Sequence, residues 1–115
     1  MPDPDCLFCK IVAKEIPSEV VRETANVLAF RDINPGAPTH VLVIPKEHIK
    51  SASYLEAAHG DLLVELFDVM EQIGTEAGIS DGYRIVTNVG PKAGQSVFHI
   101  HFHVLGGRPL SWPPG

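Results

Sequence analysis

Three histidines occupy alternate positions near the C-terminal end of the chain, in the stretch SVFHIHFHVLGGR. They are His99, His101 and His103, half of the six histidines in the sequence. In a β-strand, residues at i, i+2 and i+4 share one face, whereas on a helix the three imidazoles would spread around the cylinder. The spacing therefore predicts a strand with a row of imidazoles on one face. The intervening apolar residues would face a core: Ile100, Phe102 and Val104.

A row of imidazoles suits either metal binding or phosphoryl transfer. A His-x-His pair on a strand can hold one zinc ion, but His99 and His103 would lie about 13 Å apart, too far for one ion to bind all three. A neutral imidazole is a nucleophile near pH 7, and an imidazolium donates protons and hydrogen bonds to phosphate oxygens. A purely structural origin is the third interpretation, and the clustering argues against it.

The loop VGPKAGQS leads directly into the histidine stretch. Its residues Gly94, Gln95 and Ser96 offer backbone N–H groups and a hydroxyl at the entry to the predicted strand, a place suited to hold a phosphate. Joined to the histidines, this loop favours phosphoryl or nucleotidyl chemistry.

Two cysteines, Cys6 and Cys9, form a Cys-x-x-Cys pair. A structural disulfide is not expected in a reducing compartment. A redox pair, half of a metal site and two inert thiols remain open from the spacing alone.

The rest of the sequence predicts the elements that must position these residues. Residues 60–79 form an amphipathic helix, because apolar residues recur at steps of three and four, and Gly78 fits a C-cap. A shorter helix is expected over 6–17, ending before Pro17. Besides the histidine strand, four strands are expected, over 19–24, 26–33, 40–45 and 82–88. The order predicts an α+β fold with a mostly antiparallel five-stranded sheet, the long helix on one face and the histidine face open.

The composition bounds the class of protein. A chain of 115 residues suits a single domain over 1–115, with 109–115 as an extended tail. The net charge of −5 and the pI near 5.6 argue against a broad nucleic-acid surface, but not against a small nucleotide site. The N-terminus MPDPDCLFCK resembles no signal peptide, and no apolar run approaches the roughly 20 residues of a membrane span. We therefore expect a cytoplasmic location and no membrane partner.

The stretch HIHFHVL resembles the histidine triad (HIT) signature, in which three histidines alternate with apolar residues. The resemblance covers nearly the whole chain, and FCKIVAKEIPSEVV, LAFRDINPGAPTHVLVIPKEHI, GYRIVTNVG and GGRPLSWPPG are similar to the Hint branch of that family. DINPGAPTH and the WPPG ending are typical of this branch rather than of the Fhit or uridylyltransferase branches. The resemblance implies a HIT-like fold that dimerises into a ten-stranded sheet. It also implies hydrolysis of the P–N bonds of purine nucleoside phosphoramidates such as AMP-amines, and of the mixed-anhydride bonds of aminoacyl adenylates, through a nucleotidyl-histidine intermediate.

The resemblance also implies roles for individual residues. His101 would be the nucleophile, and His103 and His40 would flank the phosphate as hydrogen-bond donors and candidate acids. Asp32 would bind the ribose hydroxyls. The phosphate and leaving group would contact Asn88, Gly94, Gln95 and Ser96. The purine slot would be formed by Phe8, Ile11, Phe30, Ile33 and Leu42, although each of these apolar residues could equally be simple core. Trp112, in the tail, would lie on the leaving-group side of the partner subunit's site.

A structural zinc site is the expectation for the remaining histidine of the triad. Zinc takes four nitrogen or sulfur ligands in a tetrahedral array, and many bacterial-type members of the family carry such a site. The ligands here would be Cys6, Cys9, His48 and His99. The alternative is that the thiols are inert and that His99 only orients its neighbours. No catalytic metal is expected, and His59 is given no role.

Two further functions stay open. One is hydrolysis of dinucleoside polyphosphates, as in a sister branch of the family. The other is a zinc-stapled homodimer that binds nucleotides or docks to a partner, with incidental hydrolysis. The presence of both His101 and His103 favours an enzyme, because a binding module needs no nucleophile.

Overall fold

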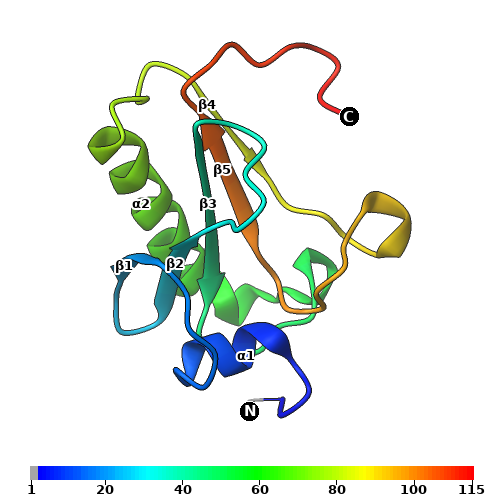
Figure 1. Cartoon of the computed structure of the whole chain (residues 1–115). Coiled ribbons are helices and arrows are strands. Elements are labelled where there is room, and N and C mark those ends of the chain that lie inside the picture. Colours follow the sequence, from blue (N-terminus) through cyan, green and yellow to red (C-terminus); the bar gives the residue numbers. More distant parts are fainter. Residues whose placement is uncertain (1–2) are drawn as a thin grey trace.

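The chain folds around one five-stranded antiparallel sheet (Figure 1). The computed structural model describes residues 3–115. Across the sheet the order is β1-β2-β3-β5-β4, so β5, which carries the last histidine of the triad, lies between β3 and the edge strand β4. The predicted α+β class with five mostly antiparallel strands and one long helix is confirmed. The strands and α-helices are β1 Val20–Glu23, β2 Val27–Arg31, β3 Thr39–Pro45, β4 Tyr83–Val86, β5 Phe102–Gly106, α1 Leu7–Val12 and α2 Gly60–Glu76.

The two faces of the sheet are covered by different helices. On one face, Val43 of β3 belongs to the same core cluster as Leu66 and Met70 of α2. On the other face, Leu42 and Ile44 of β3 belong to a second cluster with residues of α1. The side chains of β3 alternate between the two clusters, as its pleat requires. The expectation that the histidine face would be open is therefore only partly met, because α1 covers part of it.

The histidine stretch is only partly a strand. β5 begins at Phe102, so His99 and His101 precede it and only His103 lies within it. The backbone before β5 bonds elsewhere, because the Ile100 amide donates to the carbonyl of Ile49 at 2.6 Å. The prediction of one strand through all three histidines is therefore wrong. The alternation nevertheless persists in the residues buried against α2: Ile100, Phe102 and Val104.

The N-terminal helix is shorter than the sequence predicts. It was expected over 6–17 but ends at Val12. Lys14 adopts a positive φ of 64°, and the Glu15 amide bonds back to the carbonyl of Lys10 at 2.9 Å. This left-handed residue ends the helix in the way that a glycine commonly does. The chain then runs into the segment 16–19, which borders the cleft described below.

The long helix agrees with its prediction. α2 ends at Glu76, and Gly78 follows with a φ of 72°, the conformation expected just after a helix C-cap. Among residues 3–115, no helix is both long enough and apolar enough to cross a membrane.

Three short 3₁₀ helices were not predicted. They are η1 Ala52–Tyr54, η2 Ala57–His59 and η3 Pro91–Ala93. His59 has a local role in η2, because its Nδ1 accepts a hydrogen bond from the Glu56 amide at 2.9 Å.

Glu65 of α2 ties the β1–β2 turn to the helix, and its removal should destabilise the fold. Its carboxylate accepts from the Thr24 hydroxyl at 2.5 Å and from the Asn26 side-chain amide at 3.0 Å. We expect Glu65→Ala to lower the free energy of unfolding by about 1 kcal/mol, a fall in Tm of roughly 3–6 °C. Glu71→Ala, which removes only a contact with Thr75 within the helix, should cost less than about 0.5 kcal/mol.

The contribution of Glu65 to the free energy of unfolding should decrease at acidic pH. Hydrogen bonds from Thr24 and Asn26 lower the pKa of its carboxyl below the ordinary value of 4.5. A lowered pKa means that the folded state favours the ionised form. The contribution is therefore fully present above pH 4.5 and is lost as the pH falls through the folded-state pKa. Thermal denaturation of Glu65→Ala and wild type at pH 7 and pH 3 measures this, and an equal Tm difference at both values would contradict it.

Candidate functional site

His101 is held with one ring nitrogen bonded to the backbone and the other free of that bond. Its Nδ1 lies 2.8 Å from the carbonyl oxygen of His99. A carbonyl can only accept, so Nδ1 carries the proton, and Nε2 of the neutral ring has an unprotonated lone pair. Phe8 packs edge-on against this ring, with the centroids 5.1 Å apart at 90°. The side chain is buried at 7% exposure, so its orientation is fixed by packing as well as by the hydrogen bond.

His40 and His103 form a pair whose protons are ordered by the backbone of Gly36. The Gly36 amide donates to Nδ1 of His40 at 2.8 Å, so the proton of neutral His40 lies on Nε2. This Nε2 donates to Nδ1 of His103 at 2.8 Å, which leaves the proton of neutral His103 on its own Nε2. Asp32 Oδ2 lies 3.4 Å from His40 Nε2 and favours a proton there. The ring centroids of His101 and His103 are 5.2 Å apart, so the two imidazoles are neighbours.

The environment keeps His103 neutral. Its pKa is lowered to about 4, mainly by burial and in part by the neighbouring His101 and His40, against an opposing effect of Asp32. Asp32, His40 and His103 also bring possible ligand atoms within 4.8 Å of one another. However, the 2.8 Å contact between two nitrogens is shorter than the roughly 3.3 Å between two nitrogen ligands of a tetrahedral zinc. We therefore interpret this group as a hydrogen-bonded proton network.

A cleft of about 500 Å³ opens beside α1. Phe8 contacts Phe30 at 5.5 Å between centroids and also contacts His101, so the apolar floor continues to the His101 ring. Leu42, expected in the purine slot, is not a lining residue, and at 7% exposure it belongs to the core beneath. The lining includes these sequence-predicted residues: Phe8, Ile11, Phe30, Asp32 and Ile33. The sequence did not indicate these further lining residues: Leu7, Ile16, Pro17, Ser18, Glu19 and Arg31.

The loop before the triad offers fewer phosphate-binding groups than expected. The amides of Gly94 and Gln95 donate to carbonyls within the η3 turn, at 3.0 and 3.1 Å. The Gln95 side chain is buried and bonds to three backbone groups, so it braces the loop. Both amides are therefore paired within the turn, and a contact of these two residues with a phosphate stays a prediction. Within residues 3–115, the Ser96 amide and hydroxyl are unpaired, and Asn88 approaches the loop at Gly94.

The other predicted cluster assembles at the start of α1. Cys6 is the N-cap of this helix, and its Sγ accepts from the Cys9 amide at 3.4 Å. Its Sγ lies 3.4 Å from Nδ1 of His99, and Cys9 Sγ lies 3.3 Å from Nδ1 of His48 and 3.6 Å from Nδ1 of His99. The two histidine Nδ1 atoms are 3.2 Å apart. The structure therefore brings all four predicted metal ligands together, within 4.8 Å of one another.

These four side chains fit a tetrahedral zinc ion. Zinc bonds of about 2.3 Å to sulfur and 2.0–2.1 Å to nitrogen give ligand separations of roughly 3.5 Å for S–N and 3.3 Å for N–N. The observed distances agree closely with these values. His99 donates from Nε2 to the Pro45 carbonyl at 2.8 Å, so its Nδ1 lone pair faces the thiols. Burial lowers the pKa of His99 to about 4, which keeps its ring neutral, and raises the pKa of the Cys6 thiol. A zinc cation would offset the negative charge of the buried thiolate.

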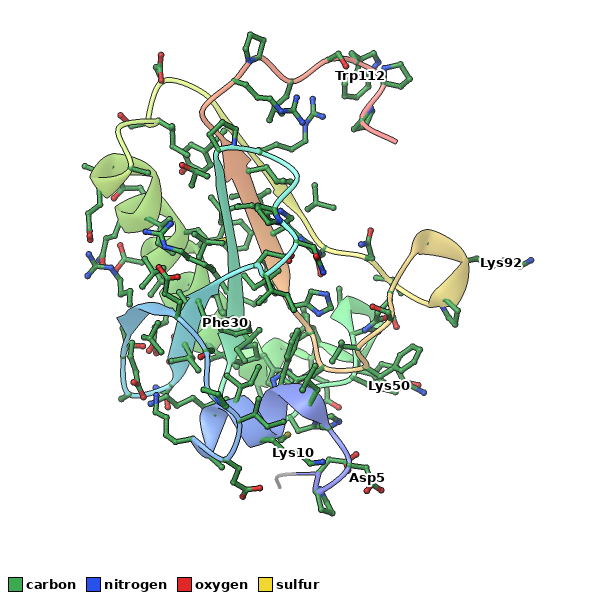
Figure 2. The ribbon with its side chains drawn as sticks, viewed as in Figure 1. Asp5, Lys10, Phe30, Lys50, Lys92 and Trp112 are labelled. Carbon is green, nitrogen blue, oxygen red and sulfur yellow. The ribbon has the colours of Figure 1, made fainter. Side chains whose placement is uncertain are left out.

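Trp112 lies away from these groups in the single chain. It is 82% exposed, on a tail that runs past the far end of the sheet from α1 (Figure 2). Arg84 fastens this tail by donating to the Ser111 carbonyl at 2.9 Å. The structure of one chain therefore leaves the expected role of Trp112 in a partner's site as a prediction.

Sequence reasoning missed the backbone groups that order the imidazoles. The His99 carbonyl, the Gly36 amide and the Pro45 carbonyl select the protonated nitrogen of His101, His40 and His99, respectively. Side-chain patterns carry no signal for such contacts, because every residue has backbone polar groups and only the folded conformation shows which of them meets a ring nitrogen.

Comparisons with known proteins agree with this arrangement. The chain is 50% identical over 115 residues to a 14 kDa zinc-binding protein of Zea mays, covering 98% of this chain and 90% of the relative. It is 47% identical over 115 residues to the adenylylsulfatase HINT1 of Arabidopsis thaliana, covering 98% of this chain and 78% of the relative. The crystal structure of a HIT family hydrolase from Legionella pneumophila superposes with a TM-score of 0.95 at 49% identity, covering 96% of this chain and 100% of the other. The profile of the HIT domain family matches residues 13–110. The chain belongs to the HIT domain family.

Proposed function

We propose that the protein hydrolyses purine nucleoside 5′-phosphoramidates such as AMP-amines, and the mixed anhydrides of aminoacyl adenylates, through a nucleotidyl-His101 intermediate. One observation carries this proposal: the His101 ring, whose Nε2 is free of the backbone bond, lies 5.2 Å between centroids from the ring of His103, whose proton is on Nε2. A neutral nucleophile next to a hydrogen-bond donor suits attack on a phosphorus whose oxygens are negatively charged. The names of the relatives, a HIT family hydrolase and an adenylylsulfatase, support nucleotide hydrolysis.

The cleft supplies the nucleotide-binding part of the proposal. The purine lies on the apolar floor formed by Phe8, Ile11 and Phe30, against the exposed side chain of Ile33. The Asp32 carboxylate accepts from the ribose hydroxyls at the end of the cleft nearest His40. An apolar floor binds any purine face, so adenine and guanine are poorly distinguished. The phosphate then lies at His101, with Ser96 and Asn88 beside it.

The reaction proceeds in two displacements. First, His101 Nε2 bonds to the α-phosphorus as the P–N bond breaks, and the leaving nitrogen takes the proton from His103 Nε2. The His40 N–H bonded to His103 stabilises that ring as it loses the proton, and the positive charge on the phosphorylated ring of His101 offsets the loss. Second, water attacks the phosphorus, the P–Nε2 bond breaks, and a water proton returns to His103. The products are the nucleoside monophosphate and the free amine.

A second candidate substrate is adenylyl sulfate, which the name of the Arabidopsis relative suggests. The same nucleophile would attack the same phosphorus. Sulfate leaves as an anion and needs no proton, so this substrate depends less on His103 than an amine does.

Direct turnover tests the proposal. A fluorogenic AMP-amine, adenylyl sulfate and diadenosine tetraphosphate should be compared with the same enzyme preparation. Preference for the first supports a phosphoramidase, and preference for the third supports the dinucleoside polyphosphate hydrolase. Binding of AMP without turnover of any of the three would instead support a nucleotide-binding module.

We further propose a structural role for zinc and a homodimer. Zinc bound by Cys6, Cys9, His48 and His99 would fasten α1, and with it Phe8, to the chain segment that precedes β5. A second copy would pair along β4, Tyr83–Val86, which is the sheet edge nearest β5, and give a ten-stranded sheet. Pairing there would satisfy the unbonded backbone of an edge strand.

Deleting the residues after Arg108 should change leaving-group preference. Trp112 is 82% exposed in one chain, and docking it on a partner would gain about 1.5–3 kcal/mol. If it lies beside the leaving group in the partner's site, the deletion should alter relative kcat/KM for a bulky and a small AMP-amine by about fivefold or more. The nucleotidyl-His101 adduct should still form. An unchanged ratio in the truncated protein would mean that the tail does not reach the site.

A further inference from the structure

Arg108 reaches the loop that orders the catalytic imidazoles. It lies two residues after the end of β5, and its Nη2 donates to the Gly36 carbonyl at 2.9 Å. The amide of the same Gly36 donates to Nδ1 of His40 at 2.8 Å, and Nε2 of His40 lies 2.8 Å from Nδ1 of His103. A chain of three hydrogen bonds therefore runs from an exposed guanidinium to the nitrogen pair of the site.

The loop 34–38 also packs closely at both ends of this series of hydrogen bonds. A Cβ added to Gly107, which has a φ of 92°, would lie 2.9 Å from Pro38 Cβ. A Cβ added to Gly36 would lie 3.7 Å from Nδ1 of His40. The end of β5 and the His40 ring thus both fit against the backbone of this loop, so a hydrogen bond that holds the loop also holds the Gly36 amide over the imidazole.

We propose that Arg108 is a positioning residue that sets the tautomers of His40 and His103. With the Gly36 amide in place, Nδ1 of His40 must accept, so the protons lie on Nε2 of both rings. When the loop is released, the proton of His40 can move to Nδ1. Its Nε2 then accepts from Nδ1 of His103, and Nε2 of His103 presents a lone pair in place of a proton.

The consequence for catalysis rests on the proposed function. A His103 without an Nε2–H cannot protonate a leaving amine, but sulfate leaves without that proton. We therefore expect Arg108→Gln to lower kcat for an AMP-amine about 10- to 100-fold with KM changed less than about twofold. The fall for adenylyl sulfate should be about tenfold smaller than the fall for the amine.

The tautomers themselves provide a readout that does not depend on activity. Two-bond ¹H–¹⁵N spectra distinguish a protonated from an unprotonated ring nitrogen, and His40 can be assigned from a His40→Asn variant. In the wild-type protein without nucleotide, His40 should have an unprotonated Nδ1 and a protonated Nε2. In Arg108→Gln this pattern should be lost or averaged. Arg108→Lys keeps one donor within reach of the Gly36 carbonyl and should restore it in part.

Arg84→Gln is the matched control. Arg84 also donates from Nη2 to a backbone carbonyl at 2.9 Å, that of Ser111, and the substitution changes the net charge equally. It should leave the His40 pattern unchanged. An unchanged pattern in Arg108→Gln, with Tm close to that of wild type, would overturn the proposal. A changed pattern with an unchanged kcat for the amine would also overturn it. If wild type hydrolyses neither substrate, the proposed function fails, and the spectra still decide whether Arg108 orders the pair.

Discussion

His101→Ala is expected to fold and bind AMP but to lose turnover of AMP-amines by at least about 10³-fold. The reason is that the proposed reaction forms a bond from His101 Nε2, and no other side chain supplies that atom. Phe8 loses its edge-on contact with the ring, so a modest fall in Tm should accompany the loss. Steady-state kinetics together with calorimetric titration of AMP separates the missing nucleophile from a damaged cleft.

The covalent step can be observed directly. Wild type quenched during turnover should carry a nucleotidyl adduct that is labile in acid and stable in base, as expected of a phosphorus–nitrogen bond, and His101→Ala should carry none. Added imidazole should restore part of the turnover, because it can occupy the space left by the ring. His59→Ala is the control, since His59 caps η2 and belongs to neither cluster. Normal turnover by His101→Ala would refute the role.

The parts of the site that could be predicted are those encoded by local spacing. The alternation of apolar residues with His99, His101 and His103 correctly placed a core on the opposite side of the chain, although the strand begins only at Phe102. The reason for the difference is tertiary: the Ile100 amide bonds to the Ile49 carbonyl, a partner far away in the sequence. Alternating patterns indicate which side a residue faces, but not whether a neighbouring strand is present to pair with it.

The four zinc-binding candidates could be named because each is a strong ligand type, but their proximity depends on the fold. Cys6 and Cys9 lie in one helical turn, which spacing predicts. His48 follows β3 and His99 precedes β5, and these strands are antiparallel neighbours. The C-terminal end of β3 and the N-terminal end of β5 therefore lie at the same end of the sheet, and α1 lies against that end. The pairing order β3-β5 supplies this proximity, and the sequence alone did not establish that order.

The hydrogen bonds inside the loop before the triad could not be predicted from its composition. The sequence indicated that Gly94 and Gln95 offer backbone N–H groups at the entry to the histidine stretch, and the structure pairs both amides within the η3 turn. Gly94 has a φ of 99°, which explains why glycine stands there without any need for a phosphate. A glycine-containing loop next to catalytic residues is therefore a weak indication of a binding site until its own hydrogen bonds are known.

Removing zinc is expected to destabilise the protein strongly. Protein purified without a histidine tag should contain about one zinc ion per chain, since the four ligand atoms lie at separations that one tetrahedral ion requires. An ion present at 1,000 times its dissociation constant stabilises the folded state by about 4 kcal/mol, a Tm difference of roughly 10–20 °C here. A chelator should therefore lower the Tm of wild type by that amount.

A ligand variant makes the cause specific. Cys9→Ser should contain little zinc, should have the lower Tm without chelator, and should not respond to chelator further. His59→Asn should retain both the zinc and the response. Wild type that contains no metal, with both thiols freely titratable, would contradict the site.

When zinc is removed, the Tm should fall before the catalytic rate does. The position of His99 explains how the two are linked. The side chain of His99 is a proposed zinc ligand, whereas its backbone carbonyl accepts the proton of His101 Nδ1 at 2.8 Å. Its Nε2–H bond to the Pro45 carbonyl and the core around Ile100 persist when the ion leaves, so the carbonyl keeps its position at moderate temperature. Activity measured at 25 °C in chelator should therefore stay within about threefold of the zinc-loaded enzyme, and it should collapse at the lowered Tm. A fall at 25 °C as large as that of His101→Ala would instead mean that zinc itself holds the nucleophile in place.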